Sequence, residues 1–83
     1  MPAKVVLYTR AGCHLCDEAR NALLALRAEG ARFVLREVDI DGDERLLATF
    51  MERIPVVEVG GEIVSELAID APAVRSRLDT VAA

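Results

Sequence analysis

The sequence predicts a single α/β domain built on a four-stranded mixed sheet with helices on both faces. Its 83 residues leave room for one domain only. Apolar runs of strand length alternate with helical patterns in the order βαβαββα. Two consecutive glycines separate the last two strand-like runs, as the turn of a tight hairpin requires. The sheet is therefore expected to combine a parallel crossover with an antiparallel hairpin.

The first half of the chain predicts a βαβ unit. Residues 4–9 form a continuous apolar run, which is typical of a central strand covered on both faces. The pattern becomes helical from residue 13 to about residue 29, and Gly30 is a natural C-terminal stop. Residues 33–40 form the second predicted strand. The apolar side chains expected on the buried side of the helix are Leu15, Ala19, Ala22, Leu23 and Leu26.

The second half predicts a helix, a hairpin and a last helix. Residues 41–43 (Asp-Gly-Asp) supply a turn and a cap for the second helix, which must end before Pro55. Residues 56–59 and 62–65 flank the glycine pair of the hairpin. Pro72, two residues after an aspartate, marks the start of the last helix. The side chains expected to be buried are Leu46, Leu47, Phe50 and Met51 on the second helix and Val74, Leu78 and Val81 on the last.

Composition excludes several classes of function. Ten Lys and Arg against fourteen Asp and Glu give a net charge of −4, which argues against a nucleic-acid-binding protein. Aromatic residues make up 4% with no Trp, so stacking platforms for bases or sugars are not expected. No apolar stretch reaches the length of a signal peptide or a membrane span. We therefore expect a cytoplasmic protein with no membrane partner, in a compartment where thiols are kept reduced.

Both cysteines fall in one tetrapeptide, Cys13-His14-Leu15-Cys16, where the first strand leads into the first helix. Residues three apart in a helix have Cα atoms about 5 Å apart, within the range of a disulfide. Cys13 lies near the unpaired N–H groups and the positive end of the helix dipole, which favour a thiolate, and Arg10 adds positive charge nearby. Cys16, one turn further in, is better suited to resolve a mixed disulfide. This spacing predicts thiol–disulfide exchange.

Other interpretations of the same residues stay open. Cys13 could hold a metal ion or an iron–sulfur cluster in a carrier protein, or the two thiols could be idle. Two Cys and one His cannot close a tetrahedral site within one chain, so a carrier would need ligands from outside. We assign no metal ligand. His14 is interpreted as a modulator of the thiolate or a plain surface residue, and Tyr8 as a packing residue.

The run from Tyr8 to Cys16, with Arg53-Ile54-Pro55 and Gly60-Gly61 further along, resembles glutaredoxin-like proteins of the thioredoxin superfamily. The similarity covers nearly the whole chain, including the order of elements. It implies a thioredoxin-like fold with a redox-active disulfide and a role in cell redox homeostasis. It also implies an enzyme, a thiol–disulfide oxidoreductase that reduces protein or low-molecular-weight disulfides by a dithiol mechanism. Cys13 would be the nucleophile and Cys16 the resolving thiol.

The resemblance further implies a set of substrate-binding residues. Pro55 would be cis and lie against the cysteine pair, with the backbone of Ile54 pairing with an extended substrate. Arg10 matches the basic residue that binds the glutathione carboxylate in glutaredoxins. With His14 between the cysteines, the expected substrate-binding residues are Arg10, His14, Ile54 and Pro55.

The chain departs from glutaredoxins in two places. His14 and Leu15 replace the usual Pro-Tyr pair between the cysteines. Residues 65–69 (Ser-Glu-Leu-Ala-Ile) replace a Gly-Gly-Cys-Asp-Asp-like run that holds the amino end of glutathione. We therefore expect a disulfide-containing protein or a small-molecule thiol as partner. No bound cofactor is expected, glutathione is a candidate co-substrate, and the protein is expected to be a monomer.

Overall fold

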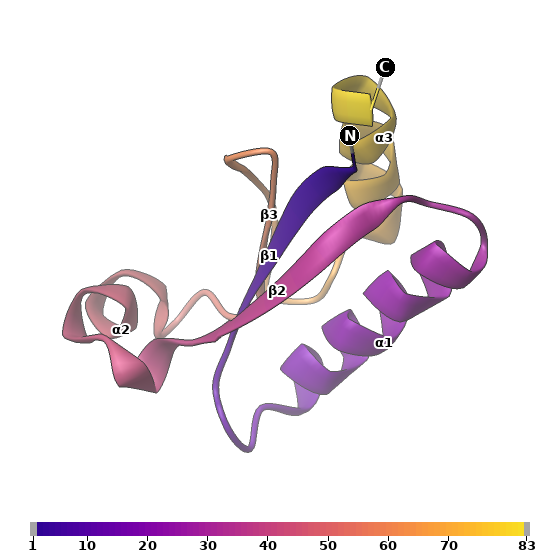
Figure 1. Ribbon diagram of the computed structural model, residues 1–83. Coiled ribbons are helices and arrows are strands. Elements are labelled where there is room, and N and C mark those ends of the chain that lie inside the picture. Colours follow the sequence, from indigo (N-terminus) through magenta and orange to yellow (C-terminus); the bar gives the residue numbers. More distant parts are fainter. Residues whose placement is uncertain (1, 83) are drawn as a thin grey trace.

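The computed structural model describes residues 2–82 and contains the mixed four-stranded sheet that the sequence predicts (Figure 1). The strand order is β2-β1-β3-β4, with β1 and β2 parallel and the other two pairs antiparallel. The elements along the chain are β1 (Ala3–Thr9), α1 (His14–Ala28), β2 (Phe33–Asp39), the 3-10 helix η1 (Ile40–Gly42), α2 (Glu44–Phe50), β3 (Val56–Val59), β4 (Glu62–Glu66) and α3 (Ala71–Ala82).

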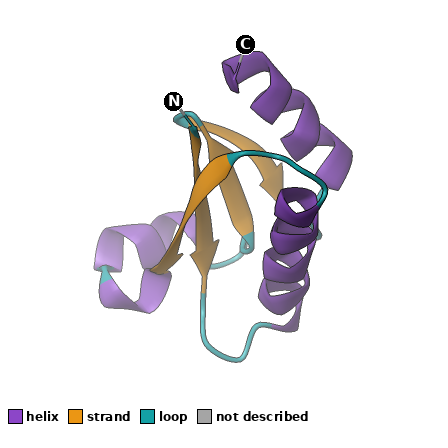
Figure 2. Cartoon of the chain, turned by 45° about the vertical axis from the view of Figure 1, so that its right-hand side comes forward, coloured by secondary structure: helices purple, strands orange, loops and turns teal. Residues whose placement is uncertain are grey.

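Helices cover both faces of the sheet, with α1 and α3 on one side and α2 on the other (Figure 2). Alternation along β1 and β3 sends successive side chains to opposite faces. Val57 accordingly packs with α1 and α3, and Val56 packs with α2. The larger core, between the sheet and the α1–α3 layer, consists of Val5, Leu7, Ala19, Leu23, Leu26, Phe33, Val57, Val59, Val74 and Leu78.

The helix cap before α2 and the turn between β3 and β4 lie at the residues that the sequence predicts. Asp43 caps α2, since its carboxylate accepts the N–H groups of Arg45 at 2.8 Å and Leu46 at 3.3 Å. Gly60 and Gly61 have φ of +58° and +85°, the pair of positive values that a two-residue hairpin turn needs. These residues fix the entry to α2 and the register of the β3–β4 hairpin.

Several details differ from the sequence-based expectations. The helical stripe on α1 contains Cys16 and not Leu15, which is 39% exposed, because positions 16, 19, 23 and 26 form the inward row. Met51 is exposed because α2 ends at Phe50 and the helical face does not continue. Val81 is exposed in the last turn of α3, and Ile40 begins the 3-10 helix where a strand residue was expected.

The two ends of the sheet carry different features. β1 starts and α3 ends at one end of the molecule, as both views show (Figures 1 and 2). At the opposite end β1 runs out into the loop before α1, and β2 runs out into η1. Because β3 is antiparallel to β1 and β4 is antiparallel to β3, the start of β3 and the end of β4 lie at this second end too. It carries the cysteine pair.

Candidate active site

The site is assembled where three segments meet at this end of the sheet. Val56, the first residue of β3, has Tyr8 of β1 as its partner on one side and Glu66 of β4 on the other. The register therefore brings together the loop after β1, the segment just before Val56 and the residue just after β4. Loops at the ends of strands are common places for catalytic residues, because the sheet holds them rigidly.

Cys13 and Cys16 form a disulfide, with Cα atoms 5.2 Å apart. Cys13 is the N-cap of α1, in the extended region with φ −93° and ψ 107°, and its Sγ accepts the N–H of Cys16 at 3.1 Å. This N–H is one of the donors that a helix start leaves without a partner in the helix. The cysteine pair therefore forms part of the helix cap.

The two sulfurs differ in their access to solvent. Cys16 is 1% exposed and belongs to the inward row of α1, whereas Cys13 is partly exposed. The Cys13 N–H donates to the carbonyl of Arg10 at 3.3 Å, and Gly12 adopts φ +77° within this turn. The turn holds Cys13 at the outer end of the helix, so Cys13 is more accessible from solvent than Cys16.

Arg10 is held in an ion pair beside the cysteine loop. Its Nε lies 2.9 Å from a carboxylate oxygen of Asp41 in η1, and both side chains are about 40% exposed. Parallel pairing of β1 and β2 matches Thr9 with Asp39, which brings residues 10 and 41 to the same edge. Binding of a substrate carboxylate by Arg10 stays a prediction, and such a carboxylate would share the guanidinium with Asp41.

The first turns of α1 carry further charged groups. The exposed His14 lies 3.4 Å from Glu18, one turn along the helix. Arg20 pairs with Glu37 of β2 and, at 2.9 Å, with Asp17. Hydrogen bonds to Glu37 and then to Asp17 raise the pKa of Arg20 above its usual value. These ion pairs connect the start of α1 to β2 and so help to fix the position of the helix start relative to the sheet.

The peptide bond between Ile54 and Pro55 is cis, as the resemblance to glutaredoxin-like proteins implies, and Pro55 is buried. Pro55 directly precedes Val56, so it lies at the end of the sheet that carries the cysteines. The Ile54 N–H donates to the carbonyl of Phe50 at 3.1 Å. A substrate strand that paired with this N–H would have to replace that bond.

Tyr8 is a packing residue, as the sequence indicates. Its ring stacks on Phe50 with ring centroids 4.6 Å apart, and its hydroxyl donates to Glu58 at 3.1 Å. Burial, followed by the hydrogen bond to Glu58 and the charge of that carboxylate, raises the pKa of Tyr8 above 10.0. Tyr8 thus links β1, α2 and β3 on the face of the sheet that α2 covers.

One site feature carries no signal in the sequence. Leu67, directly after β4, has φ +59°, and its N–H donates to the carbonyl of Arg53 at 2.9 Å. Glycine or asparagine would have marked a left-handed position, whereas an isolated leucine does not. The sequence gives no reason to single it out.

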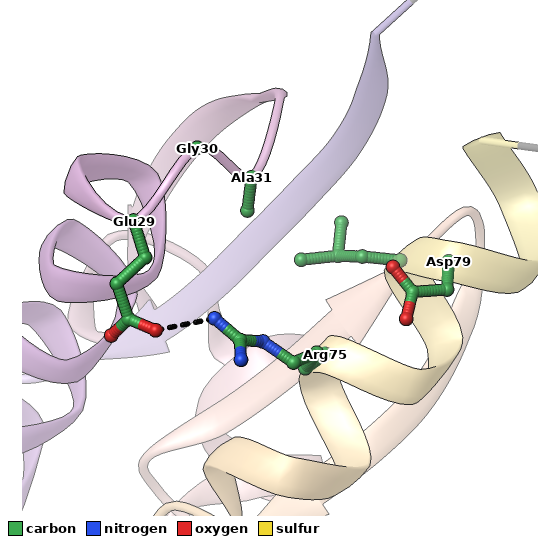
Figure 3. Close-up of a pocket in the computed structure, with 6 residues that line it drawn as sticks. Glu29, Gly30, Ala31, Arg75 and Asp79 are labelled. Atoms are coloured by element: carbon green, nitrogen blue, oxygen red, sulfur yellow. Dashed lines mark hydrogen bonds and ion pairs between the residues drawn. The ribbon is translucent and has the colours of Figure 1, made fainter.

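A pocket of about 370 Å³ lies at the other end of α1 (Figure 3). Glu29 and Arg75 form an ion pair across it, and Asp79 points toward it from α3. The six described residues that line it include neither cysteine nor the histidine. Because α1 has 15 residues and is about 22 Å long, this pocket is separate from the cysteine pair.

Within residues 2–82, no group of three or more His, Cys, Asp or Glu side chains is arranged to hold a metal ion. In the same part of the chain, no helix is long and apolar enough to cross a membrane.

Comparisons with known proteins agree with this geometry. The solution NMR structure of protein Ne2328 from Nitrosomonas europaea matches with a TM-score of 0.81 and 31% identity, covering 92% of this chain and 91% of that one. The X-ray structure of protein XcR50 from X. campestris matches with a TM-score of 0.70 and 33% identity, covering 92% and 96%. A thioredoxin variant from Halobacterium salinarum, 19% identical over 94% of this chain and 73% of its own, shares the fold with a TM-score of 0.66.

The family comparison covers most of the sequence. The model of the glutaredoxin-like domain (DUF836) matches residues 4–79. The fold is thioredoxin-like, and the cysteine pair at disulfide distance supports a redox role. The chain belongs to the glutaredoxin-like domain family.

Proposed function

We propose that this protein is a thiol–disulfide oxidoreductase that reduces disulfides by a dithiol mechanism. The observation that carries the proposal is the arrangement of the two sulfurs. Cys13 is partly exposed at the N-cap of α1 with its sulfur on the N–H of Cys16, and Cys16 is buried behind it in the inward row of the helix. This difference in burial supports Cys13 as the thiol that attacks a substrate and Cys16 as the thiol that attacks only the Cys13 sulfur.

In the reduced protein the Cys13 thiolate attacks one sulfur of a substrate disulfide. A Cys13–substrate disulfide forms, and the other half of the substrate leaves as a thiolate that takes up a proton. Cys16 then loses its proton, and its thiolate attacks the Cys13 sulfur. The second substrate thiolate leaves and is protonated, and the Cys13–Cys16 disulfide is formed. Two electrons have passed to the substrate, and an external thiol reductant restores the dithiol.

The helix start favours this order of events. The Cys16 N–H and the positive end of the α1 dipole stabilise negative charge on the Cys13 sulfur. They therefore stabilise Cys13 as the attacking thiolate. They also stabilise it as the leaving group when, after a reductant thiol has attacked Cys13 and displaced Cys16, a second thiol attacks the reductant sulfur of that mixed disulfide. A thiolate at a helix N-terminus is a common means of activating cysteine.

The proposal is tested first by redox titration. The protein is equilibrated in glutathione buffers of graded potential, quenched with an alkylating agent, and weighed as an intact protein by mass spectrometry. We expect a reversible Cys13–Cys16 disulfide with a potential between about −120 and −270 mV, the range of known dithiol enzymes. Two thiols that stay free across the whole range would contradict the proposal.

Variants of the two cysteines test their separate roles. Cys16→Ser is expected to accumulate a mixed disulfide on Cys13, because the resolving thiol is missing. The matched variant, Cys13→Ser, is expected to accumulate much less, because Cys16 is 1% exposed. Equal adducts on the two variants would contradict the assignment of roles. Coloured, freshly purified protein with no such adduct would instead indicate a cluster carrier.

A further inference from the structure

Leu67 has a backbone conformation that its side chain does not favour. Its φ of +59° lies in the left-handed region, where Cβ approaches the following carbonyl oxygen. Glycine and asparagine adopt this region routinely, whereas a bulky residue found there is a strained outlier. The sequence nevertheless has leucine at this position.

Packing does not account for the leucine either. Leu67 is 52% exposed and belongs to neither of the two core clusters of the described residues. Exposed apolar side chains are ordinary when they lie singly on a surface. A leucine that is both strained and exposed is different, because the fold gains little from it. Strained residues of this kind concentrate at binding and catalytic sites.

The position of Leu67 connects it to the cysteine pair. Its N–H donates to the carbonyl of Arg53 at 2.9 Å, two residues before the cis proline. The preceding residue, Glu66, is the Cα partner of Val56, whose other partner is Tyr8, at the end of β1. Leu67 therefore lies at the end of the sheet from which the loop to Cys13 leaves. Leu15, in the first turn of α1, is a second exposed apolar side chain next to the sulfurs in sequence.

The carboxylates beside Leu67 are already engaged. Glu66 forms an ion pair with Arg53, and Asp70 accepts the N–H of Ala73 at the start of α3 at 3.1 Å. This stretch therefore offers an apolar side chain between two carboxylates that already have hydrogen-bond or ion-pair partners. Such a surface matches an apolar side chain of a polypeptide better than the charged amino end of a small peptide thiol.

We propose that Leu67 determines specificity, by selecting disulfides in polypeptides that carry an apolar side chain close to the reactive cysteine. This inference rests on the proposed function of the cysteine pair. In an extended chain, side chains two residues apart share a face and lie about 7 Å from each other. The side chains two positions before and after the substrate cysteine are therefore the ones that the test varies.

The test uses two nine-residue peptides with a central cysteine blocked as a mixed disulfide with thionitrobenzoate. One has leucine and the other serine two positions before and after the cysteine. Reduced protein in excess is mixed with each peptide, and release of the coloured thiol gives the second-order rate constant. We expect the protein to react about tenfold faster with the leucine peptide. Leu67→Ala should reduce this preference to about twofold or less.

The matched control is Leu24→Ala, since Leu24 is 44% exposed on α1 but lies away from the site. This variant should keep the full preference. Leu67→Gly removes the side chain and adopts φ +59° without strain, so it tests the side chain in a protein with a relaxed backbone. It should lose the preference as Leu67→Ala does, with cooperative thermal melting showing that it is folded.

The outcomes separate this inference from the proposed function. Three outcomes would each overturn the role of Leu67. The natural protein could react with both peptides at equal rates, either Leu67 variant could keep the preference for the leucine peptide, or Leu24→Ala could lose it. Intact mass after the reaction reports the Cys13–Cys16 disulfide separately. If that disulfide forms with both peptides at equal rates, only the specificity inference fails. If it forms with neither, the proposed function fails.

Discussion

Replacing Cys13 with serine is expected to give a more stable protein than replacing it with alanine. Cys13 is the N-cap of α1, and its sulfur accepts the N–H of Cys16 at 3.1 Å. Serine keeps an acceptor at this position and is among the preferred N-cap residues, whereas alanine leaves the donor without a side-chain partner. Neither variant can form the internal disulfide, so the comparison isolates the cap.

The size of the effect follows from the cap alone. Loss of an N-cap acceptor costs about 1 kcal/mol, within a range of about 0.5–2 kcal/mol. For a domain of 83 residues, about 1 kcal/mol corresponds to a change in melting temperature of about 4–8 °C. Cys13→Ser should therefore melt about 4–8 °C above Cys13→Ala.

The measurement is thermal and urea unfolding of both variants, followed by far-ultraviolet circular dichroism with a reductant that keeps Cys16 free. Asn21 supplies the matched control, because it is exposed in the middle of α1. There Asn21→Ala should be more stable than Asn21→Ser by about 0.5 kcal/mol, since alanine has the higher helix propensity. The order of stability thus reverses between the two positions. Alanine at position 13 as stable as serine would refute the capping argument.

Two further predictions concern the two faces of the sheet. Leu23→Ala should lower the free energy of unfolding by about 2–5 kcal/mol, because Leu23 is fully buried in the larger core. A urea unfolding midpoint close to that of the natural protein would contradict this. Tyr8 is the only tyrosine and there is no tryptophan, so an absorbance titration should report the raised pKa of Tyr8 directly. Glu58→Gln should lower the pKa of Tyr8, because it removes the carboxylate whose charge opposes the phenolate. Because the pKa of Tyr8 is raised in the folded state, the contribution of Tyr8 to stability is complete below its pKa in the unfolded chain, near 10. That contribution is lost as the pH rises through the pKa in the folded protein. A measured pKa at or below 10 in the folded protein would contradict this.

The sequence predicts the order of elements because the strongest signals are local. Gly30, with φ +109° just beyond the end of α1, and the Gly60–Gly61 turn need only their own backbone geometry to act. The cap at Asp43 likewise involves residues two and three positions away. Which helical side chains are buried is harder to predict, because the periodicity argument assigns every apolar residue near the stripe to the buried face. Leu15 is misplaced for this reason, and Cys16 takes the buried position.

Several features of the site are not encoded by local patterns in the sequence. The ion pair between Arg10 and Asp41 joins residues 31 positions apart and follows from the register of β1 and β2, which no local pattern encodes. The cis bond before Pro55 was implied only by the resemblance to a known family, since most prolines are trans. The left-handed backbone at Leu67 is set by the hydrogen bond to Arg53 and the chain reversal after β4. A residue type alone cannot reveal such a constraint.

The start of β1 and the end of α3 lie together at the end of the molecule opposite the cysteine pair (Figure 1). Linkers that continue from these two elements would leave from a surface that a substrate docking at Cys13 does not occupy. A fluorescent redox reporter or a surface anchor could therefore be fused at either side without blocking the thiols. The same arrangement would let a larger polypeptide carry this fold as an appended domain, with the cysteine pair at the end far from the linker.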